Sequence, residues 1–452
     1  MKMASIIRFL TTYKRIIVFL PVFALAALIL IQPDEFGRIA DLCLLAILVM
    51  LIASQFFWIR RILDIGERFL PGKPRRNFLA VVAGLVYLFF FIYNFGPLTS
   101  SFHILRTADT RLGSVLLEGA FWWWLVGSWA GFVLVIVFWT ADRAKRSTAW
   151  LYRKARDAAA PHIAPLQPGA PILDPPSPDR RRFLQQTAIA LSATPFVASA
   201  YGLLYGRLDL EVTRRRIVLS RLPIAFEGFR IAQLSDFHIS PFMLAEEIRR
   251  CVTITNGLQP DLVVMTGDFV AWDPEADREV VQALSGLRAP YGVFGCLGNH
   301  ETETETQESI IRLFAAQNVR ILRQEHVPVQ VRGEALNLIG VDDENGRLRG
   351  VKELMMPDTV NILLNHDPSN FDRAARLGID LTLAGHTHGG QLSLEFLRRG
   401  LCLSRLETPY VSGWYEKSGS QLYVNRGIGT TGFPIRVGAR PEITLIDLAC
   451  KG

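Results

Sequence analysis

Four uncharged apolar runs in the first third of the chain constrain its fold more than any other feature. They cover Ile16–Ile31, Leu42–Ile59, Phe78–Phe95 and Gly119–Ala141. A helix needs roughly 17–25 such residues to cross a bilayer core of about 30 Å, and each run approaches or exceeds that length. Buried helices of a soluble protein are the alternative. Four such runs in succession favour an all-α transmembrane domain, which we place at residues 1–142.

The basic residues indicate how these runs are oriented. Residues 1–203 hold 22 Lys and Arg against 11 Asp and Glu, and the remainder holds 27 against 31, so the net charge of +7 belongs to the apolar half. The bases gather before the first run, between the second and third, and after the fourth. By the positive-inside rule these segments face the cytoplasm. The charge is therefore a topology signal, and we do not expect nucleic acid as a partner.

Two segments connect this domain to the rest of the chain. Residues 143–179 are basic and then proline-rich, which predicts a cytoplasmic linker. Residues 180–206 open with Arg-Arg-Arg-Phe-Leu and continue as a weakly apolar stretch, similar to a twin-arginine export signal. A fifth membrane anchor is the alternative. If this segment spans, the remaining residues 207–452 are periplasmic, and if it lies on the surface they stay cytoplasmic.

Residues 207–452 alternate short apolar strands with helical patterns, which predicts an α/β domain. Five of the expected strands end in polar residues. These strands are Phe229–Leu234 before Ser-Asp-Phe-His, Asp261–Met265 before Thr-Gly-Asp, Tyr291–Leu297 before Gly-Asn-His-Glu, Val360–Leu364 before Asn-His-Asp, and Ile379–Leu383 before Ala-Gly-His-Thr-His-Gly-Gly. Ligands of open α/β sheets bind at the carboxyl ends of the strands, so we expect a functional site there.

Five of the eight histidines fall inside these strand-end clusters. A single such histidine is usually a hydrogen-bonded structural residue, but five beside two aspartates and an asparagine predict a metal site. Imidazole and carboxylate ligands without cysteine suit a divalent ion such as Mn, Fe, Zn or Mg. Seven candidate ligands are too many for one ion with an open position, so two ions sharing a carboxylate are the simpler interpretation. The candidates are Asp236, His238, Asp268, Asn299, His366, His386 and His388.

In this order, Asp-x-His, Gly-Asp, Gly-Asn-His-Glu, a lone His and Gly-His-x-His resemble the motifs of the calcineurin-like metallophosphoesterase superfamily. The resemblance covers roughly Phe229 to Leu448 and implies a sandwich of two sheets flanked by helices. It implies that His300 is the catalytic histidine, which protonates the leaving oxygen or stabilises the phosphoryl charge. It also implies a distribution of ligands, with Asp236, His238 and His388 on one metal, Asn299, His366 and His386 on the other, and Asp268 bridging the two.

The Gly-His-Thr-His-Gly-Gly-Gln form and the closing Asn-Arg-Gly and Arg-Pro-Glu look like a bacterial, membrane-associated branch. That branch is similar to UDP-2,3-diacylglucosamine pyrophosphatases of lipid A biosynthesis. The resemblance implies a hydrolase of a phosphodiester or pyrophosphate bond in the bacterial inner membrane, with the lipid bilayer and an amphiphilic phosphoester as partners. The alternatives are a periplasmic phosphodiesterase of other envelope or nucleotide phosphoesters, and a membrane sensor or transport protein with a regulatory phosphoesterase domain.

Two arginines and one segment are further candidates for substrate contact. Arg426 and Arg436 could each bind a substrate phosphate through paired hydrogen bonds, with a structural salt bridge as the alternative. The segment Glu395–Leu406 mixes apolar and basic residues. This mixture predicts contact with the bilayer or with an acyl chain beside the active site.

Overall fold

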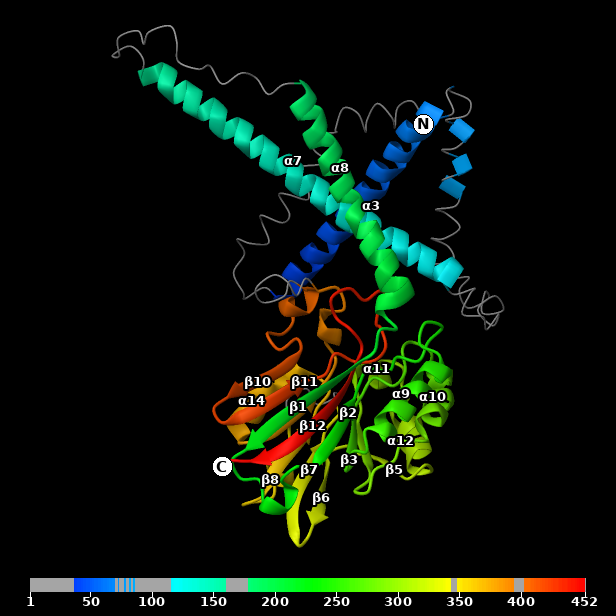
Figure 1. The fold of residues 1–452 in the computed structure, drawn as a ribbon, viewed down its shortest axis with the longest axis vertical. Coiled ribbons are helices and arrows are strands. Elements are labelled where there is room, and N and C mark those ends of the chain that lie inside the picture. The colour runs from blue at the N-terminus through cyan, green and yellow to red at the C-terminus, as the bar shows by residue number, and fades with distance from the viewer. Residues whose placement is uncertain are drawn as a thin grey trace. The chain divides into compact units, whose positions relative to one another are not determined.

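The computed structural model describes residues 36–69, 115–159, 178–342, 348–393 and 402–451, with a few positions between 72 and 85. The chain forms two compact units (Figure 1). One comprises Met1–Ile104 and Trp123–Ala198, and the other comprises Leu105–Trp122 and Ser199–Gly452. The first unit is helical in its described part, and the second carries both β-sheets.

The described long helices are α3 (Phe36–Phe69), α7 (Ala120–Ala159) and α8 (Pro178–Tyr201). Among the described residues, two stretches are long and apolar enough to cross a membrane, Ala120–Ala155 and Gln186–Gly206. They coincide with the fourth predicted run and the mid-chain anchor segment. The second run lies within α3, which is not one of these two stretches. The first run and most of the third lie outside the described residues, so the four-span domain stays a prediction.

One helix extends further than the sequence predicts. α7 continues to Ala159, so the predicted linker at 143–179 begins with helix. The first proline after the apolar run is Pro161, and the intervening residues include good helix formers such as Ala, Arg and Lys. The helix continues past the end of the apolar run because the loss of hydropathy there does not interrupt backbone hydrogen bonding.

Glycines and polar groups join the helices of the first unit. A Cβ atom added to Gly127 would lie 2.7 Å from the Phe196 ring, and one added to Gly131 would lie 2.5 Å from the Ser192 carbonyl oxygen. Trp123 Nε1 also donates a hydrogen bond to the Phe196 carbonyl oxygen at 2.8 Å. Close backbone approach at small residues and hydrogen bonds between helices are the usual means of helix association in lipid.

The second unit contains two six-stranded mixed sheets (Figure 1). The order of the first sheet is β1-β12-β2-β3-β4-β5, and that of the second is β10-β11-β9-β8-β7-β6. The strands of the first sheet are β1 (Glu211–Leu219), β2 (Arg230–Leu234), β3 (Leu262–Thr266), β4 (Val293–Cys296), β5 (Val319–Ile321) and β12 (Glu442–Cys450). Those of the second are β6 (Glu325–Val331), β7 (Glu334–Gly340), β8 (Val360–Leu364), β9 (Leu381–Ala384), β10 (Gly413–Lys417) and β11 (Ser420–Val424).

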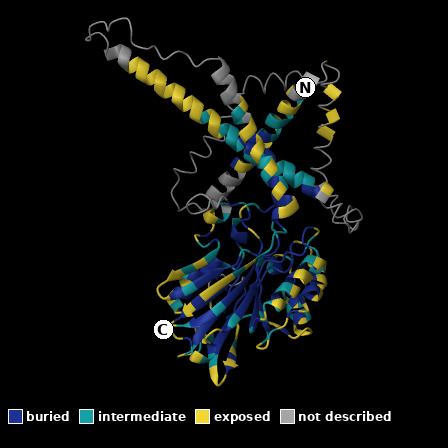
Figure 2. Cartoon of the chain, viewed as in Figure 1, coloured by how far each residue is buried: buried dark blue, intermediate teal, exposed yellow. Residues whose placement is uncertain are grey.

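The two sheets pack face to face, and helices cover their outer faces. Ile231 and Leu262 of the first sheet share one buried cluster with Leu336 and Leu381 of the second. The alternate positions of the first sheet, such as Ala232, pack against helices α9 (Ala245–Gly257), α10 (Asp277–Leu284) and α12 (Gln307–Ala315). Helices α13 (Val351–Leu354) and α14 (Phe371–Leu377) pack on the second sheet. Figure 2 shows the strands largely buried, and the predicted two-sheet α/β sandwich is confirmed.

Strand direction explains where the site forms. β2, β3 and β4 run parallel to one another in the first sheet, and β7, β8 and β9 do so in the second. Parallel strands end at the same edge of a sheet, so the loops after β2, β3 and β4 lie side by side, as do those after β8 and β9.

Candidate active site

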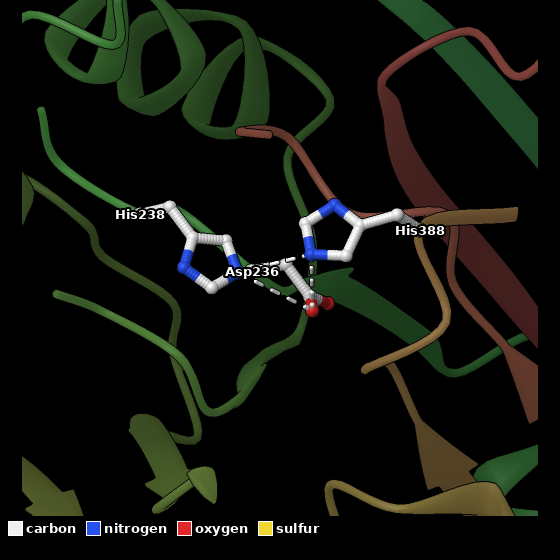
Figure 3. A group of neighbouring side chains, drawn as sticks. All are labelled: Asp236, His238 and His388. Atoms are coloured by element: carbon white, nitrogen blue, oxygen red, sulfur yellow. Dashed lines mark hydrogen bonds and ion pairs between the residues drawn. The ribbon is translucent and has the colours of Figure 1, made fainter. Parts of the chain in front are cut away.

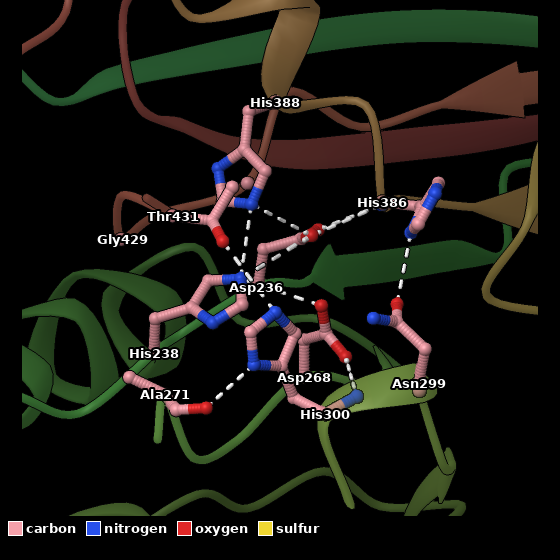
Figure 4. Close-up of polar contacts among 12 residues, drawn as sticks. Asp236, His238, Asp268, Ala271, Asn299, His300, His386, His388, Gly429 and Thr431 are labelled. Atoms are coloured by element: carbon pink, nitrogen blue, oxygen red, sulfur yellow. Dashed lines mark hydrogen bonds and ion pairs between the residues drawn. The ribbon is translucent and has the colours of Figure 1, made fainter. Parts of the chain in front are cut away.

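The eight predicted site residues lie together in the loops that follow five strands, and Figure 4 shows seven of them. Asp236 and His238 follow β2, Asp268 follows β3, Asn299 and His300 begin helix α11 (Asn299–Glu303) after β4, His366 follows β8, and His386 and His388 follow β9. Five of them have positive φ, namely Asp236 (54°), His238 (46°), Asp268 (56°), His386 (70°) and His388 (51°). Residues other than glycine adopt this left-handed backbone conformation at an energetic cost. Such strain concentrates at functional sites.

Asp236, His238 and His388 form the first cluster (Figure 3). Their side chains are buried, and the Nε2 atoms of the two histidines lie 2.9 Å apart. His388 Nε2 also lies 3.3 Å from Asp236 Oδ1. Burial lowers the pKa of His238 to about 3, and burial with the nearby His238 and Arg436 lowers that of His388 well below its usual value. Two neutral imidazoles that direct nitrogen atoms at one carboxylate fit a divalent cation.

Asp268, His366 and His386 form the second cluster. His366 Nδ1 donates a hydrogen bond to the Thr266 carbonyl oxygen at 2.5 Å, so its Nε2 atom carries the lone pair in the neutral ring. That Nε2 atom faces Asp268 Oδ2 at 3.1 Å. Burial opposes the charged ring, but the charge of Asp268 and the hydrogen bond to it raise the pKa of His366 well above its usual value. A proton or a metal cation therefore belongs between these two atoms.

Asp268 connects the two clusters. Its Oδ2 atom lies 3.3 Å from His238 Nε2 and 3.1 Å from His366 Nε2, one histidine from each side. Asn299 completes the second side, because its Oδ1 atom lies 3.0 Å from His386 Nδ1. A shared carboxylate with nitrogen donors on both sides fits a pair of cations.

His300 has one ring nitrogen tied to the backbone and one facing the site (Figure 4). Nδ1 donates to the Ala271 carbonyl oxygen at 2.5 Å, and Nε2 lies 3.4 Å from Thr431 Oγ1. The backbone N–H of His300 donates to Asp268 Oδ1 at 3.0 Å. His300 also forms, with His238 and Asp268, a third group of side chains close enough together to hold a metal ion. Its assignment as proton donor therefore stays a prediction.

Glu301 organises the site, and sequence reasoning missed it. Its buried carboxylate accepts four backbone hydrogen bonds, from Gly298 at 2.8 Å, Asp268 at 3.0 Å, Phe269 at 2.7 Å and Val270 at 3.2 Å. These bonds fasten the loop after β3 to the turn after β4. Burial, reinforced by the charge of Asp268, raises the pKa of Glu301 to about 7. Its place in the first turn of a helix that follows a glycine was the available signal.

The two candidate arginines bind protein groups. Arg426 Nε donates to Glu442 Oε2 at 2.9 Å, and its Nη2 donates to Glu211 Oε2 at 2.6 Å. Arg436 is buried, and its guanidinium donates to the carbonyl oxygens of Gly429 at 2.9 Å and Ala439 at 3.1 Å. This arrangement favours a structural role for both. The segment predicted to touch the bilayer, Glu395–Leu406, is described only from residue 402 onward.

Clustered histidines and carboxylates at the strand ends of two facing sheets form a site that could hold divalent metal ions. Residues 229–390 match the calcineurin-like phosphoesterase family. The chain is 31% identical over 286 residues to the uncharacterized metallophosphoesterase YkuE of Bacillus subtilis, covering 60% of this chain and 97% of YkuE. The chain belongs to this metallophosphoesterase family and is a phosphoesterase hydrolase.

Two further relatives differ in how much of their length is matched. The chain is 28% identical over 278 residues to the phosphodiesterase YaeI of Escherichia coli, covering 60% of this chain and 98% of YaeI. It is 31% identical over 287 residues to a transmembrane protein with metallophosphoesterase domain of Bos taurus, covering 59% of this chain and 63% of that protein. That relative and the two helices of membrane-spanning length indicate membrane association.

Proposed function

We infer that the protein is a membrane-anchored hydrolase that uses two divalent metal ions to cleave a phosphodiester or pyrophosphate bond in a lipid-linked substrate. The observation that carries this proposal is the position of Asp268, whose Oδ2 atom lies within 3.3 Å of a histidine from each cluster. Two cations that share one carboxylate are the simpler interpretation of a carboxylate with histidine nitrogens from two clusters. The candidate metals are Mn, Fe, Zn and Mg; imidazole ligands suit Zn and Fe, and carboxylate ligands suit Mg and Mn.

The side chains divide into holding and proton-transfer roles. Asp236, His238 and His388 would hold one cation, Asn299, His366 and His386 the other, and Asp268 both. When bound, the two cations supply Lewis acidity that offsets negative charge on the attacking and leaving oxygens. His300 would present Nε2 to the leaving oxygen, because the bond from Nδ1 to Ala271 fixes which nitrogen is available.

The case for a lipid-linked substrate comes from a single loop, Gly429–Val437, which we call the site loop. Thr431 of this loop lies beside His300, with 3.4 Å between Oγ1 and Nε2. The rings of Phe433 and Trp122, at the start of α7, have centroids 6.3 Å apart. The two stretches of membrane-spanning length thus have one end each in the catalytic unit, and the first of these ends contacts the site loop.

The other end is helix η5 (Gly202–Gly206), which continues α8. The backbone N–H of Arg436 donates to the Gly202 carbonyl oxygen at 3.3 Å. A Cβ atom on Gly206 would lie 2.3 Å from the Arg436 carbonyl oxygen, so only glycine permits this approach. A phosphoester in the headgroup layer would be close to a site built beside these helix ends. UDP-2,3-diacylglucosamine is the first candidate, and other envelope or nucleotide phosphoesters are the second.

Metal-dependent hydrolysis by the full chain in detergent tests the proposal. The purified protein is stripped with a chelator, reloaded with Mn, Fe, Zn or Mg, and assayed for bound metal and for hydrolysis of bis-p-nitrophenyl phosphate. We expect two ions per chain and activity that returns with metal. Mixed micelles of UDP-2,3-diacylglucosamine should then be turned over faster than a soluble nucleotide diester. Binding of at most one ion would refute the metal pair, and equal turnover of both substrates would refute the lipid-linked class.

The side of the membrane is tested separately. Alkaline phosphatase fused after Gly452 is active only in the periplasm, whereas a fluorescent protein that folds only in the cytoplasm gives the opposite readout. From the positive-inside rule and a spanning α8, we expect the phosphatase fusion to be active. A cytoplasmic result would mean that the segment 180–206 does not span, and it would place the enzyme on the side where the nucleotide lipid is made.

A further inference from the structure

Trp272 is an exposed aromatic residue beside a buried active-site histidine. Its side chain follows β3 in the loop that also carries Asp268, and it is 64% exposed. Its ring lies 4.6 Å from the His300 ring, centroid to centroid, at an interplanar angle of 63°. The residues before it, Phe269, Val270 and Ala271, are all buried. The loop therefore turns outward at Trp272 and presents an indole to solvent next to the site.

Fold stability does not explain this indole. A large apolar face left in water forgoes roughly 1.5–3 kcal/mol of burial free energy. Trp414, another exposed tryptophan of the same unit, donates from Nε1 to Gln421 Oε1 at 2.8 Å and packs under the Arg215 guanidinium. Within the described residues, Trp272 Nε1 has no hydrogen-bond partner, and the ring contact of its indole is with His300. Among the ring contacts of the described residues, its indole thus meets the predicted proton donor.

The backbone places Trp272 beside the imidazole of the predicted proton donor. The Ala271 carbonyl oxygen accepts the bond from His300 Nδ1, and Trp272 is the next residue, so the two rings are positioned by adjacent atoms of the main chain. A leaving oxygen must come within about 2.6–3.2 Å of His300 Nε2 to receive a proton. The group attached to that oxygen would then lie near the imidazole, whose ring centroid is 4.6 Å from that of the Trp272 indole.

We propose that Trp272 is a specificity-determining residue that binds an apolar portion of the substrate's leaving group. This inference rests on the proposed hydrolase function and adds to it the chemistry of the leaving group. Either a planar ring or an acyl chain can cover an indole face, because both bury apolar surface against it. A small hydrophilic leaving group would make no such contact. The residue would contribute to affinity and substrate choice, and it would leave the metal ligands unchanged.

The test measures binding of phosphonates, which are not hydrolysed, to the metal-loaded full chain in detergent. Phenylphosphonate, octylphosphonate and methylphosphonate are titrated calorimetrically into the wild type, Trp272→Ala, Trp272→Phe and the control Trp414→Ala. We expect Trp272→Ala to weaken phenylphosphonate or octylphosphonate binding roughly 5- to 100-fold, the range of contacts with an aromatic side chain. Methylphosphonate binding should not change, Trp272→Phe should recover part of the loss, and Trp414→Ala should match the wild type.

The outcomes distinguish the kinds of leaving group from one another and from the absence of a Trp272 contact. Loss for phenylphosphonate alone identifies a planar leaving group, and loss for octylphosphonate alone identifies a chain. Unchanged binding of all three ligands, or an equal loss for methylphosphonate, would overturn the proposal. Metal content and thermal unfolding are measured for every variant, and if Trp272→Ala does not fold, Trp272→Phe alone gives the comparison. A wild type that binds phosphonates but hydrolyses no phosphoester would instead refute the proposed function and leave the Trp272 contact standing.

Discussion

Replacing Arg426 with methionine separates a structural arginine from a substrate-binding one. In the structure its guanidinium bonds Glu442 and Glu211 at 2.9 and 2.6 Å. The Glu442 side chain is only 2% exposed, and it also accepts a hydrogen bond from the Tyr423 hydroxyl at 2.6 Å. Methionine preserves much of the side-chain volume but removes the cation. The variant therefore leaves a carboxylate buried without its counter-charge.

The size of the stability loss follows from the burial of the Arg426–Glu442 ion pair. Removing one partner of a buried ion pair costs about 3–5 kcal/mol, because the remaining charge stays desolvated. For a unit of this size each kcal/mol lowers the melting temperature by roughly 2–4 °C, so we expect a decrease of about 6–20 °C. Arg440→Met is the matched control. Its side chain is 45% exposed and pairs with Asp209 at 2.8 Å, so its loss should cost at most about 1 kcal/mol.

The stability lost in Arg426→Met should increase with pH. Burial alone would raise the pKa of Glu442, but the charge of Arg426 and the bonds from Tyr423 and Arg426 lower it below its usual value. The wild-type pair thus contributes stability above the unfolded pKa of 4.5, and this is lost as the pH falls through the folded pKa. Without the cation, burial raises this pKa. The stability difference between variant and wild type should therefore be larger near pH 8 than near pH 5.

Thermal unfolding of the full chain in detergent, followed by tryptophan fluorescence at both pH values, measures this effect. Glu442→Gln in the Arg426→Met background should recover part of the lost stability, because it removes the unpaired charge. If Arg426→Met instead melts with the wild type and only raises KM for the phosphoester, the structural assignment is refuted. Arg426 would then act on the substrate phosphate, the other role that the sequence leaves open.

Three further predictions concern the site and the contact with η5. His300→Ala should keep both metals by elemental analysis and lose about 10²–10⁴-fold in turnover, whereas Asp268→Asn should lose metal as well; a metal-free His300→Ala would contradict these roles. Gly206→Ala should lower the melting temperature by an amount equivalent to about 1–3 kcal/mol, because the added Cβ atom would overlap the Arg436 carbonyl oxygen. The control Gly257→Ala should leave the melting temperature unchanged, because its Cβ atom would meet nothing within 4 Å. Glu301→Gln presents an amide NH₂ to two backbone donors and should cost about 2–6 kcal/mol in denaturant unfolding; wild-type stability would contradict this.

The site residues were predictable because their polar side chains follow the ends of apolar strands. Each of the eight residues stands within four positions of a strand end, and parallel strands bring those positions to the same edge of their sheet. β8 has the predicted bounds, Val360–Leu364, since a short, mostly apolar run followed by Asn-His-Asp leaves little ambiguity. Glu301 could not be predicted in the same way. Its four hydrogen-bond donors come from two separate loops, and its position in the first turn of a helix after a glycine predicts only the bond from Gly298.

Other features depend on contacts that no local pattern encodes. The pairing of β1 with β12 joins the first and last strands of the domain, and periodicity alone does not assign either of them to a sheet. One partner of Arg426 is likewise distant in sequence, since Glu211 is more than two hundred residues away. An arginine near a candidate site predicts phosphate binding and a salt bridge equally well. Only the observed carboxylates favour one of these.

The close approach of Gly202 and Gly206 to the site loop limits how the chain can be divided. Proteolysis before Gly202 would leave helix η5 attached to the catalytic unit. A cut after Gly206 would remove it and uncover Ile435, which now packs against Gly202. The same limit applies to exchange of the anchor for a foreign helix, because the graft would have to carry glycine at both places. The two glycine positions therefore couple the anchor segment to the site loop at this junction.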